Sequence, residues 1–254
     1  MTLSREKLIK KPRKYGAIDA LRGLCVAVMI IYHAVYNAVI AFGLHYGVYS
    51  NAPMDAVRWV FAFAFIFLAG FSSPMSRSNL RRGVKCALLA LCITAVTVLA
   101  GQSVYFGALH LLAVCMLIYA ALEALFPAVR ARKKRSPQGE KPTAPAILLI
   151  LMAVTAVLTE QVSFAPENFL RWISWLFGFA PNMVKTADFF PLFPWVFVFF
   201  FGAWAGRYAA ADALPEKLSA FRAPFFEMLG RRSLLIYIIH APALFGIMHA
   251  LAAI

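Results

Sequence analysis

Charge is scarce in this sequence, and acidic charge is scarcer than basic. Only 14% of the 254 residues are charged, with 25 Lys and Arg against 11 Asp and Glu. Hydrophobic residues make up 62% of the chain, a share too high for a soluble domain of this length. Because the basic residues fall between apolar runs and not on one face of a soluble fold, we expect no nucleic-acid partner.

Cysteine pairs, metal motifs and nucleophile motifs are also missing. The sequence has no HExxH, no His pair at i,i+4 and no carboxylate cluster on an apolar run, so we expect no metal. It has no G-x-S-x-G elbow either. The four cysteines lie inside apolar runs without paired short spacing, which indicates small reduced core residues: Cys25, Cys86, Cys92 and Cys115.

Long hydrophobic runs dominate what is present. A helix needs about 20 apolar residues to cross the hydrocarbon core of a bilayer. Lipid offers no water to the backbone and the runs lack the alternation of a barrel, so they must be helices. We therefore predict an all-α fold, a polytopic integral membrane bundle of about seven transmembrane helices. The predicted spans are 17–43, 56–75, 83–100, 104–126, 144–160, 189–210 and 232–253.

The connections between the runs alternate in charge. By the positive-inside rule the Lys- and Arg-rich connections are cytoplasmic, so we expect the N-terminus inside and the C-terminus outside. We divide the chain into a basic cytoplasmic segment, 1–16, and one transmembrane domain, 17–254. Within that domain we expect a basic cytoplasmic loop at 127–143 and an outward-facing segment at 161–188.

Ionisable side chains concentrate on one face of the first run. Asp19 and Arg22 are i,i+3 neighbours, and His33 returns to nearly the same face 11 residues after Arg22. Tyr36 continues this stripe, and Asn37 lies beside it. Such groups inside a bilayer usually point to a partner or a wet cavity. A structural ion pair with a packed histidine and a reactive polar face both remain open.

Three more polar residues lie in or near later runs. His110 begins the fourth run, His240 lies well inside the seventh, and Asp188 stands at the outer mouth of the sixth. Each alone is more often a hydrogen-bonded core residue. Together with His33 they predict a polar cavity within the bundle.

Five segments occur in a familiar order: "IDALRGLCVAVMIIYH" at 18–33, "FIFLAGFSSPMSRSNLRRGVK" at 65–85, "YFGALHLLAVCML" at 105–117, "DFFPLFPWVFVFFFG" at 188–202 and "LGRRSLLIYIIHAP" at 229–242. This series resembles the heparan-alpha-glucosaminide N-acetyltransferase catalytic-domain family in its small bacterial form. The first segment also resembles the opening span of the wider transmembrane acyltransferase group, including the acyltransferase-3 proteins.

The resemblance implies acyl transfer across a membrane, here the bacterial cytoplasmic (inner) membrane. Acyl-CoA, usually acetyl-CoA, would be the co-substrate on the cytoplasmic side, and an amine or hydroxyl of a sugar or glycan would accept the acyl group on the other side. Membrane lipid is the remaining expected partner, and a homo-oligomer is left open. We expect no luminal domain before the first span and little room for further modules, so the heparan substrate itself is not carried over.

The resemblance also implies roles for the polar residues. His33 would act as general base or as a transient acyl carrier, with Arg22 nearer the cytoplasmic end. His110, Asp188 and His240 would orient the acceptor or stabilise the oxyanion. In the lysosomal branch of the family the catalytic histidine lies just beyond the first span, where His45 is the nearer match; the acyltransferase-3 pattern favours His33, which we adopt. Asp19, Tyr36 and Asn37 are alternative acceptor-orienting residues.

Two basic clusters could bind the phosphates of CoA, because guanidinium groups suit bidentate phosphate contacts. Topology and attraction to anionic lipids explain the same clusters without a cofactor, and both readings stay open. The candidate residues are Arg81, Arg82, Lys85, Arg231 and Arg232.

A carrier or channel is the main competing function, because intramembrane histidines and an acid can also relay protons or bind a solute. The sequence shows no inverted repeat and no paired Gly/Pro-broken helices in its two halves, which counts against a carrier. A non-catalytic membrane subunit is a third reading, for which intact His33, Arg22 and His110 would be surprising.

Overall fold

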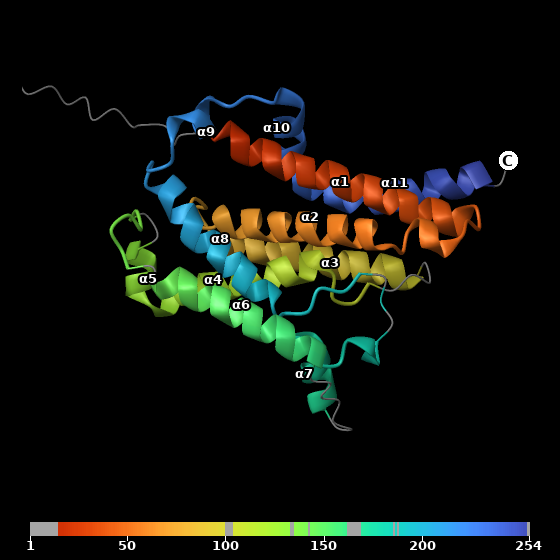
Figure 1. Ribbon diagram of the computed structural model, residues 1–254, viewed down its shortest axis with the longest axis horizontal. Helices are drawn as coiled ribbons and strands as arrows, with labels where there is room; N and C mark the ends of the chain where they lie inside the picture. Colours follow the sequence, from red (N-terminus) through yellow and green to blue (C-terminus); the bar gives the residue numbers. More distant parts are fainter. Residues whose placement is uncertain are drawn as a thin grey trace, which may run out of the picture.

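The computed structural model describes residues 15–99, 104–132, 135–141, 143–161, 169–184, 186 and 188–252. Figure 1 shows helices throughout this part of the chain, which contains no β-strand beyond a single bridge between Phe106 and Phe189. The long helices are α1 (Gly16–Ala41), α2 (Ala52–Phe71), α3 (Asn79–Leu99), α4 (Ala108–Leu125), α6 (Thr143–Gln161), α8 (Trp195–Ala210) and α11 (Ser233–Ala252). The short ones are η1 (Tyr46–Val48), α5 (Pro127–Arg132), α7 (Leu170–Phe177), η2 (Pro181–Met183), α9 (Glu216–Ala220) and α10 (Pro224–Arg231).

Five helices in the described ranges, α1, α2, α3, α4 and α6, are long and apolar enough to cross a membrane. This confirms the all-α class and several membrane-spanning helices. Helices α8 and α11 occupy the sixth and seventh predicted runs, and the count of seven and the orientation of the termini stay predictions. Large apolar side chains such as Leu88, Leu91 and Ile150 face outward from α3 and α6, as expected of helices whose solvent is lipid.

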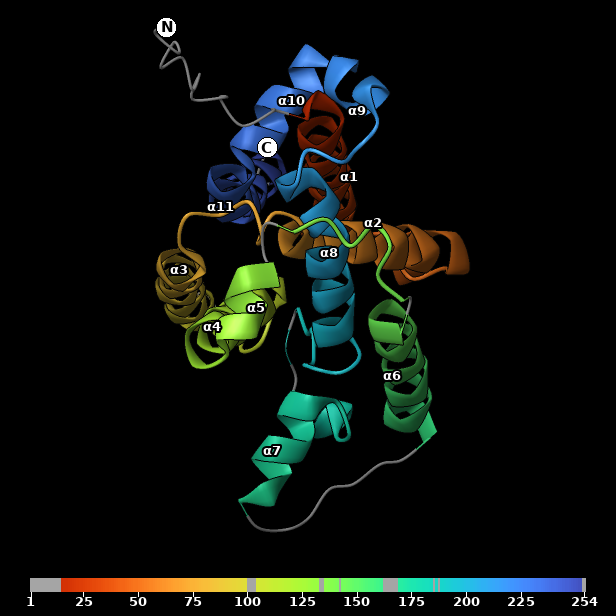
Figure 2. The ribbon, with the colours of Figure 1, turned by 90° about the vertical axis from the view of Figure 1, so that its left-hand side faces the viewer.

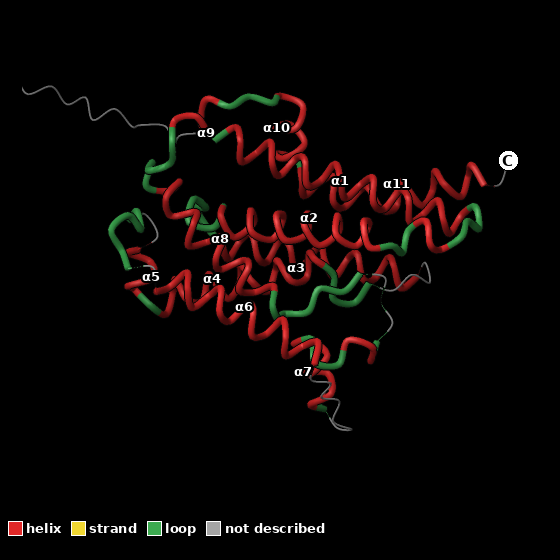
Figure 3. The backbone as a smooth tube through the Cα atoms, viewed as in Figure 1, coloured by secondary structure: helices red, strands yellow, loops and turns green. Residues whose placement is uncertain are grey.

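The long helices run side by side and define two ends of the bundle, as the tube in Figure 3 makes plain. One end carries α5, α9 and α10, and we call it the basic end. The opposite end carries the connection 42–51 between α1 and α2, and we call it the far end (Figure 1). Figure 2 places α7 at the outer edge of the molecule, below the ends of α6 and α8.

The helices pair as α1 with α10 and α11, α2 with α8, and α3 with α4. Glycines bring two of these pairs close together. A Cβ on Gly70 of α2 would lie 1.9 Å from the Phe199 carbonyl oxygen of α8, and a Cβ on Gly230 of α10 would lie 1.9 Å from the Asp19 carbonyl oxygen of α1. Small residues are how helices approach closely where lipid removes the hydrophobic driving force between them.

The loop after α5 is attached to the end of α8 through Arg207. Its Nε donates to the carbonyl oxygens of Arg132 and Arg135, at 3.1 and 3.2 Å. Its two terminal nitrogens donate to the carboxylate of Glu140 at 3.0 and 2.6 Å. These hydrogen bonds lower the pKa of Glu140 below its ordinary value. The described part of the loop predicted at 127–143 therefore has a defined place on the bundle.

The close approach of α2 and α8 makes Gly70 intolerant of even one methyl group. We expect Gly70→Ala to lower the midpoint of thermal unfolding in detergent by several degrees, because a Cβ there overlaps backbone that cannot move freely. Gly246→Ala in α11 is the matched control, since nothing lies within 4 Å of its Cβ position. Equal midpoints for the two variants would contradict the tight contact.

Ionised Glu140 contributes to the attachment of this loop. Because docking lowers the pKa of this carboxyl, ionisation stabilises the docked loop above the ordinary Glu pKa of about 4.3, and the contribution is lost as the pH falls through the lower pKa of the docked state. We expect Glu140→Gln to raise hydrogen–deuterium exchange of 135–141 at pH 7. After correction for intrinsic exchange, the exchange rate of this loop in the wild type should rise to that of the variant only in acid. An exchange rate in the variant equal to that of the wild type at pH 7 would refute this prediction.

Candidate active site

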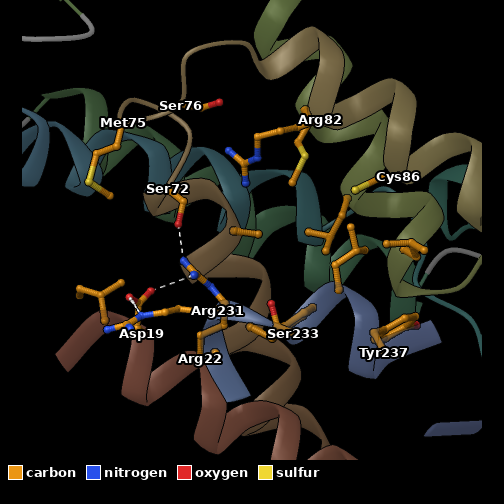
Figure 4. Close-up of a pocket in the computed structure, with 18 of the residues that line it drawn as sticks. Asp19, Arg22, Ser72, Met75, Ser76, Arg82, Cys86, Arg231, Ser233 and Tyr237 are labelled. Carbon is orange, nitrogen blue, oxygen red and sulfur yellow. Dashed lines mark hydrogen bonds and ion pairs between the residues drawn. The ribbon is translucent and has the colours of Figure 1, made fainter. Parts of the chain in front are cut away.

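A pocket of about 580 Å³ opens at the basic end between α1, α2, α3, α4 and α11. Its charged lining consists of Asp19, Arg22, Arg82, Lys85 and Arg231, so four basic groups face one acid. Figure 4 shows the arginines directed into the space between the helices. Such a pocket favours an anionic ligand.

Arg22 is held in place by two neighbours. Its Nη1 lies 3.3 Å from Oδ1 of Asp19, and its Nη2 donates to the hydroxyl of Ser72, which in turn donates to the Leu68 carbonyl (Figure 4). Arg231 reaches the other oxygen of Asp19 at 3.3 Å. Arg231 also pairs with Glu227 at 2.7 Å, so Arg22 and Arg231 share two carboxylates, and the excess positive charge of the pocket comes from Arg82 and Lys85.

Arg82 projects from α3 on the opposite wall of the pocket (Figure 4). Its guanidinium donates to the neutral amide oxygen of Asn79, and its charge acts against that of Arg22 across the pocket. Asn79 is itself buried and donates to the Ser73 carbonyl, which fixes its amide. Two like charges that face one another in a partly buried pocket are stabilised when an anion lies between them.

The inner wall of the pocket is apolar. Leu109, Leu112 and Met116 of α4 and Phe65 of α2 line it, and Tyr237 of α11 closes it. The Tyr237 ring also lies against His240, with 5.5 Å between the ring centroids. Tyr237 therefore connects the basic pocket with the histidines farther along the bundle.

His33 and His240 meet across the contact between α1 and α11. Their ring centroids lie 5.0 Å apart and their rings are edge-on at 67°. The Nδ1 of His33 bonds to the Met29 carbonyl at 2.9 Å, and that of His240 to the Tyr237 carbonyl at 2.7 Å. A carbonyl oxygen can only accept, so each Nδ1 carries a hydrogen and each neutral ring presents Nε2 as a bare lone pair.

Asp188 lies before α8 and caps the first turn of α4. Its Oδ2 accepts from the Ala108 amide at 3.1 Å, and a Cβ on Gly107 would meet the same oxygen. Burial raises the pKa of Asp188 above its ordinary value, while the hydrogen bond from Ala108 opposes that shift. Its charge also acts on His240 of α11.

His110 is held away from the histidine pair by its own partner. Thr94 of α3 donates its hydroxyl hydrogen to the Val104 carbonyl at 2.7 Å, so its oxygen accepts from Nε2 of His110 at 3.0 Å. The His110 ring also lies against Phe106. In this structure His110 joins α4 to α3 and to the segment between them.

The remaining polar candidates in and just after the first run lie toward the far end. His45 is exposed, and its Nδ1 accepts from the Gly47 amide at 3.1 Å, so it does not join the pair of His33 and His240. Asn37 donates to the His33 carbonyl on the same helix. Tyr36 packs on Tyr49, at 4.9 Å between ring centroids.

The basic residues proposed from the sequence fall into two groups. Arg82, Lys85 and Arg231 line the 580 Å³ pocket, whereas Arg81 and Arg232 are exposed and do not line it. Arg232 instead lines a smaller groove of about 280 Å³ beside α10. Among the residues that the structure describes, no group of three His, Cys, Asp or Glu side chains could hold a metal ion.

Sequence reasoning missed Tyr237 and Ser72. Tyr237 precedes His240 by three residues, and that spacing places both side chains on one face of a helix, so the signal was present in "IYIIH". Ser72 follows an apolar run and reads as an ordinary helix end. Only the fold places its hydroxyl beside Arg22.

The amino-acid sequence matches the model of a known protein family. A model of the catalytic part of heparan-alpha-glucosaminide N-acetyltransferase matches residues 14–242, which cover most of the chain and every residue of the pocket and of the histidine pair. The chain belongs to this family. Membership makes it a multi-pass membrane protein of an acetyltransferase family. Comparisons with curated proteins and with solved structures gave no match.

Proposed function

We propose that this chain transfers an acyl group, in particular acetyl, from cytoplasmic acyl-CoA to an amine or hydroxyl of a sugar on the other side of the membrane. The observation that carries the proposal is a basic pocket at one end of the bundle whose inner wall touches a pair of histidines. The basic end supports this sidedness, because Lys- and Arg-rich connections favour the cytoplasm.

The pocket suits the parts of acyl-CoA in order. Arg22 and Arg82 both line it and would hold phosphate groups between them, with Lys85 as a further point charge. The apolar wall formed by Leu109 and Leu112 suits the less polar pantetheine arm. A volume of about 580 Å³ lies in the range of small-molecule sites. The thioester would then reach the level of Tyr237.

His33 supports the chemical step through its bare Nε2. As the acceptor nitrogen or oxygen attacks the thioester carbonyl carbon, its proton passes to Nε2 of His33 and a new C–N or C–O bond forms. The C–S bond then breaks, the thiolate of CoA leaves, and the proton taken by His33 ends on that sulfur. The Nδ1–H bond to the Met29 carbonyl keeps the ring in the orientation that this role requires.

The affinity for CoA tests whether Arg82, which lines the pocket, has a role that the exposed Arg81 does not have. We expect Arg82→Gln to weaken CoA binding by roughly 10- to 100-fold in calorimetry, because a charge-assisted hydrogen bond contributes about 1.5–3 kcal/mol. Arg81→Gln removes the same charge from an exposed position one residue earlier and should change the affinity by less than about 3-fold. Equal losses in both variants would indicate general attraction and no phosphate site.

The rate of acetyl transfer tests whether His33 or His45 is the general base. We expect His33→Asn to lower acetyl transfer to a panel of amino sugars by about 100-fold or more, because it removes the general base while CoA still binds. His45→Asn should retain most of the activity, since that ring is exposed and lies off the histidine pair. The reverse ranking would move the base to His45.

If folded wild-type protein does not bind acetyl-CoA at all, the transferase proposal fails. Proton or solute flux in liposomes that depends on His33 would then support a carrier.

A further inference from the structure

The Nε2 atom of His240 is buried and has no hydrogen-bond partner among the described residues. The side chain is only 8% exposed, and its Nδ1 hydrogen is already used on the Tyr237 carbonyl. A buried lone pair without a donor is unfavourable, so natural proteins rarely leave one without a reason. The ring that carries this free Nε2 lies 5.0 Å from the His33 ring, centroid to centroid.

His33 needs a partner when it takes up a proton. Formation of an imidazolium inside the bundle is costly unless a hydrogen-bond acceptor or a negative charge stabilises it. In serine hydrolases a carboxylate on Nδ1–H plays this part, but here Nδ1 of His33 is bonded to the Met29 carbonyl. The new hydrogen would be on Nε2, and His240 is the neighbouring ring with a bare nitrogen.

We infer that His240 is the proton-sharing partner of His33, so that the two imidazoles hold one proton between their Nε2 atoms during acyl transfer. This inference rests on the proposed function and adds a positioning residue to it. Nε2 of His33 takes the proton from the amine or hydroxyl that accepts the acyl group. The new Nε2–H of His33 then donates to Nε2 of His240. When the C–S bond breaks, the proton passes to the CoA sulfur, and both rings return to their neutral forms.

The surroundings of the pair fit a shared proton. His33 packs against Tyr32 of its own helix. His240 packs against Tyr237, which lines the 580 Å³ pocket proposed to bind acyl-CoA. Asp188, from the segment before α8, is the acid whose charge acts on His240, but its Oδ2 is occupied by the Ala108 amide. Among the described residues no hydrogen bond joins Asp188 to His33 or His240, so Asp188 acts on His240 only through its charge.

A proton-sharing role and a structural role of His240 predict opposite orders of activity for two conservative variants, His240→Asn and His240→Gln. Asn at 240 keeps an N–H near the Nδ1 position, which preserves the bond to the Tyr237 carbonyl and removes the Nε2 acceptor. Gln at 240 places an amide oxygen near the Nε2 position and loses the Nδ1 donor. A proton-sharing role predicts that His240→Gln keeps more activity than His240→Asn, and a structural role predicts the reverse order.

The experiment measures pH–rate profiles for acetyl transfer by wild type, both variants and the double variant His33→Asn/His240→Asn. We expect His240→Asn to lose roughly 10- to 100-fold in kcat with unchanged CoA affinity. We expect the double variant to lose little more than His33→Asn, because the two rings act as one unit. Wild-type kcat in His240→Asn, or additive losses in the double variant, would overturn the inference.

A second measurement does not depend on acyl transfer. In ¹⁵N-histidine-labelled protein without CoA, we expect His240 in its Nδ1–H form and the signals of both rings to titrate together over one pH range. In His240→Asn, His33 should titrate as a single independent group. An Nε2–H form of His240, or independent titration in the wild type, refutes the pair even if the protein is a transferase. If the two rings titrate together but the protein transfers no acetyl group, the result contradicts the proposed function and not the histidine pair.

Discussion

The close contact of α1 with α10 and α11 is the constraint on which the site depends. Gly23 and Gly230 face each other across it, and a Cβ on either would meet the backbone of the opposite helix. The same contact brings Arg231 to Asp19 near the basic end and His240 to His33 farther along. The pairing of α1 with α10 thus places the charged groups, and its pairing with α11 places the two imidazoles.

This arrangement separates two kinds of polar chemistry along the bundle. At the basic end the guanidinium groups meet carboxylates, a hydroxyl and an amide, and the pocket still has an excess of positive charge. At the level of His33 and His240 the partners are carbonyl oxygens and aromatic rings. Fixed charge suits recognition of an anion, and neutral imidazoles suit proton transfer, so each function occupies the level where its groups are stable.

Much of the fold and part of the site could be predicted from the sequence. Hydropathy locates the long helices because lipid demands about 20 apolar residues per span. Helical periodicity relates Arg22 to Asp19 and to His33, since all three belong to one helix. Contacts between helices are different: nothing in "LRRGVK" distinguishes Arg82, which lines the pocket, from Arg81, which does not.

The hydrogen-bond partner of His110 could not be predicted from the sequence either. From sequence it resembles His33, a histidine in an apolar run, and only the packing of α3 against α4 assigns its Nε2 to Thr94. Partner choice across a helix pair depends on rotation about each helix axis, which apolar composition does not specify when the hydrophobic residues surround the helix on all sides. The unpartnered nitrogen of His240 is likewise a property of the packed bundle.

The bridge between Phe106 and Phe189 joins the two connections that lead into α4 and α8. Phe190 donates its amide to the Phe106 carbonyl at 2.9 Å, and Asp188 accepts from the amide of Ala108. The two connections are therefore joined by one backbone hydrogen bond and by one hydrogen bond from a backbone amide to a side-chain carboxylate. Any motion that separates the start of α4 from the connection leading into α8 must therefore break both of these hydrogen bonds.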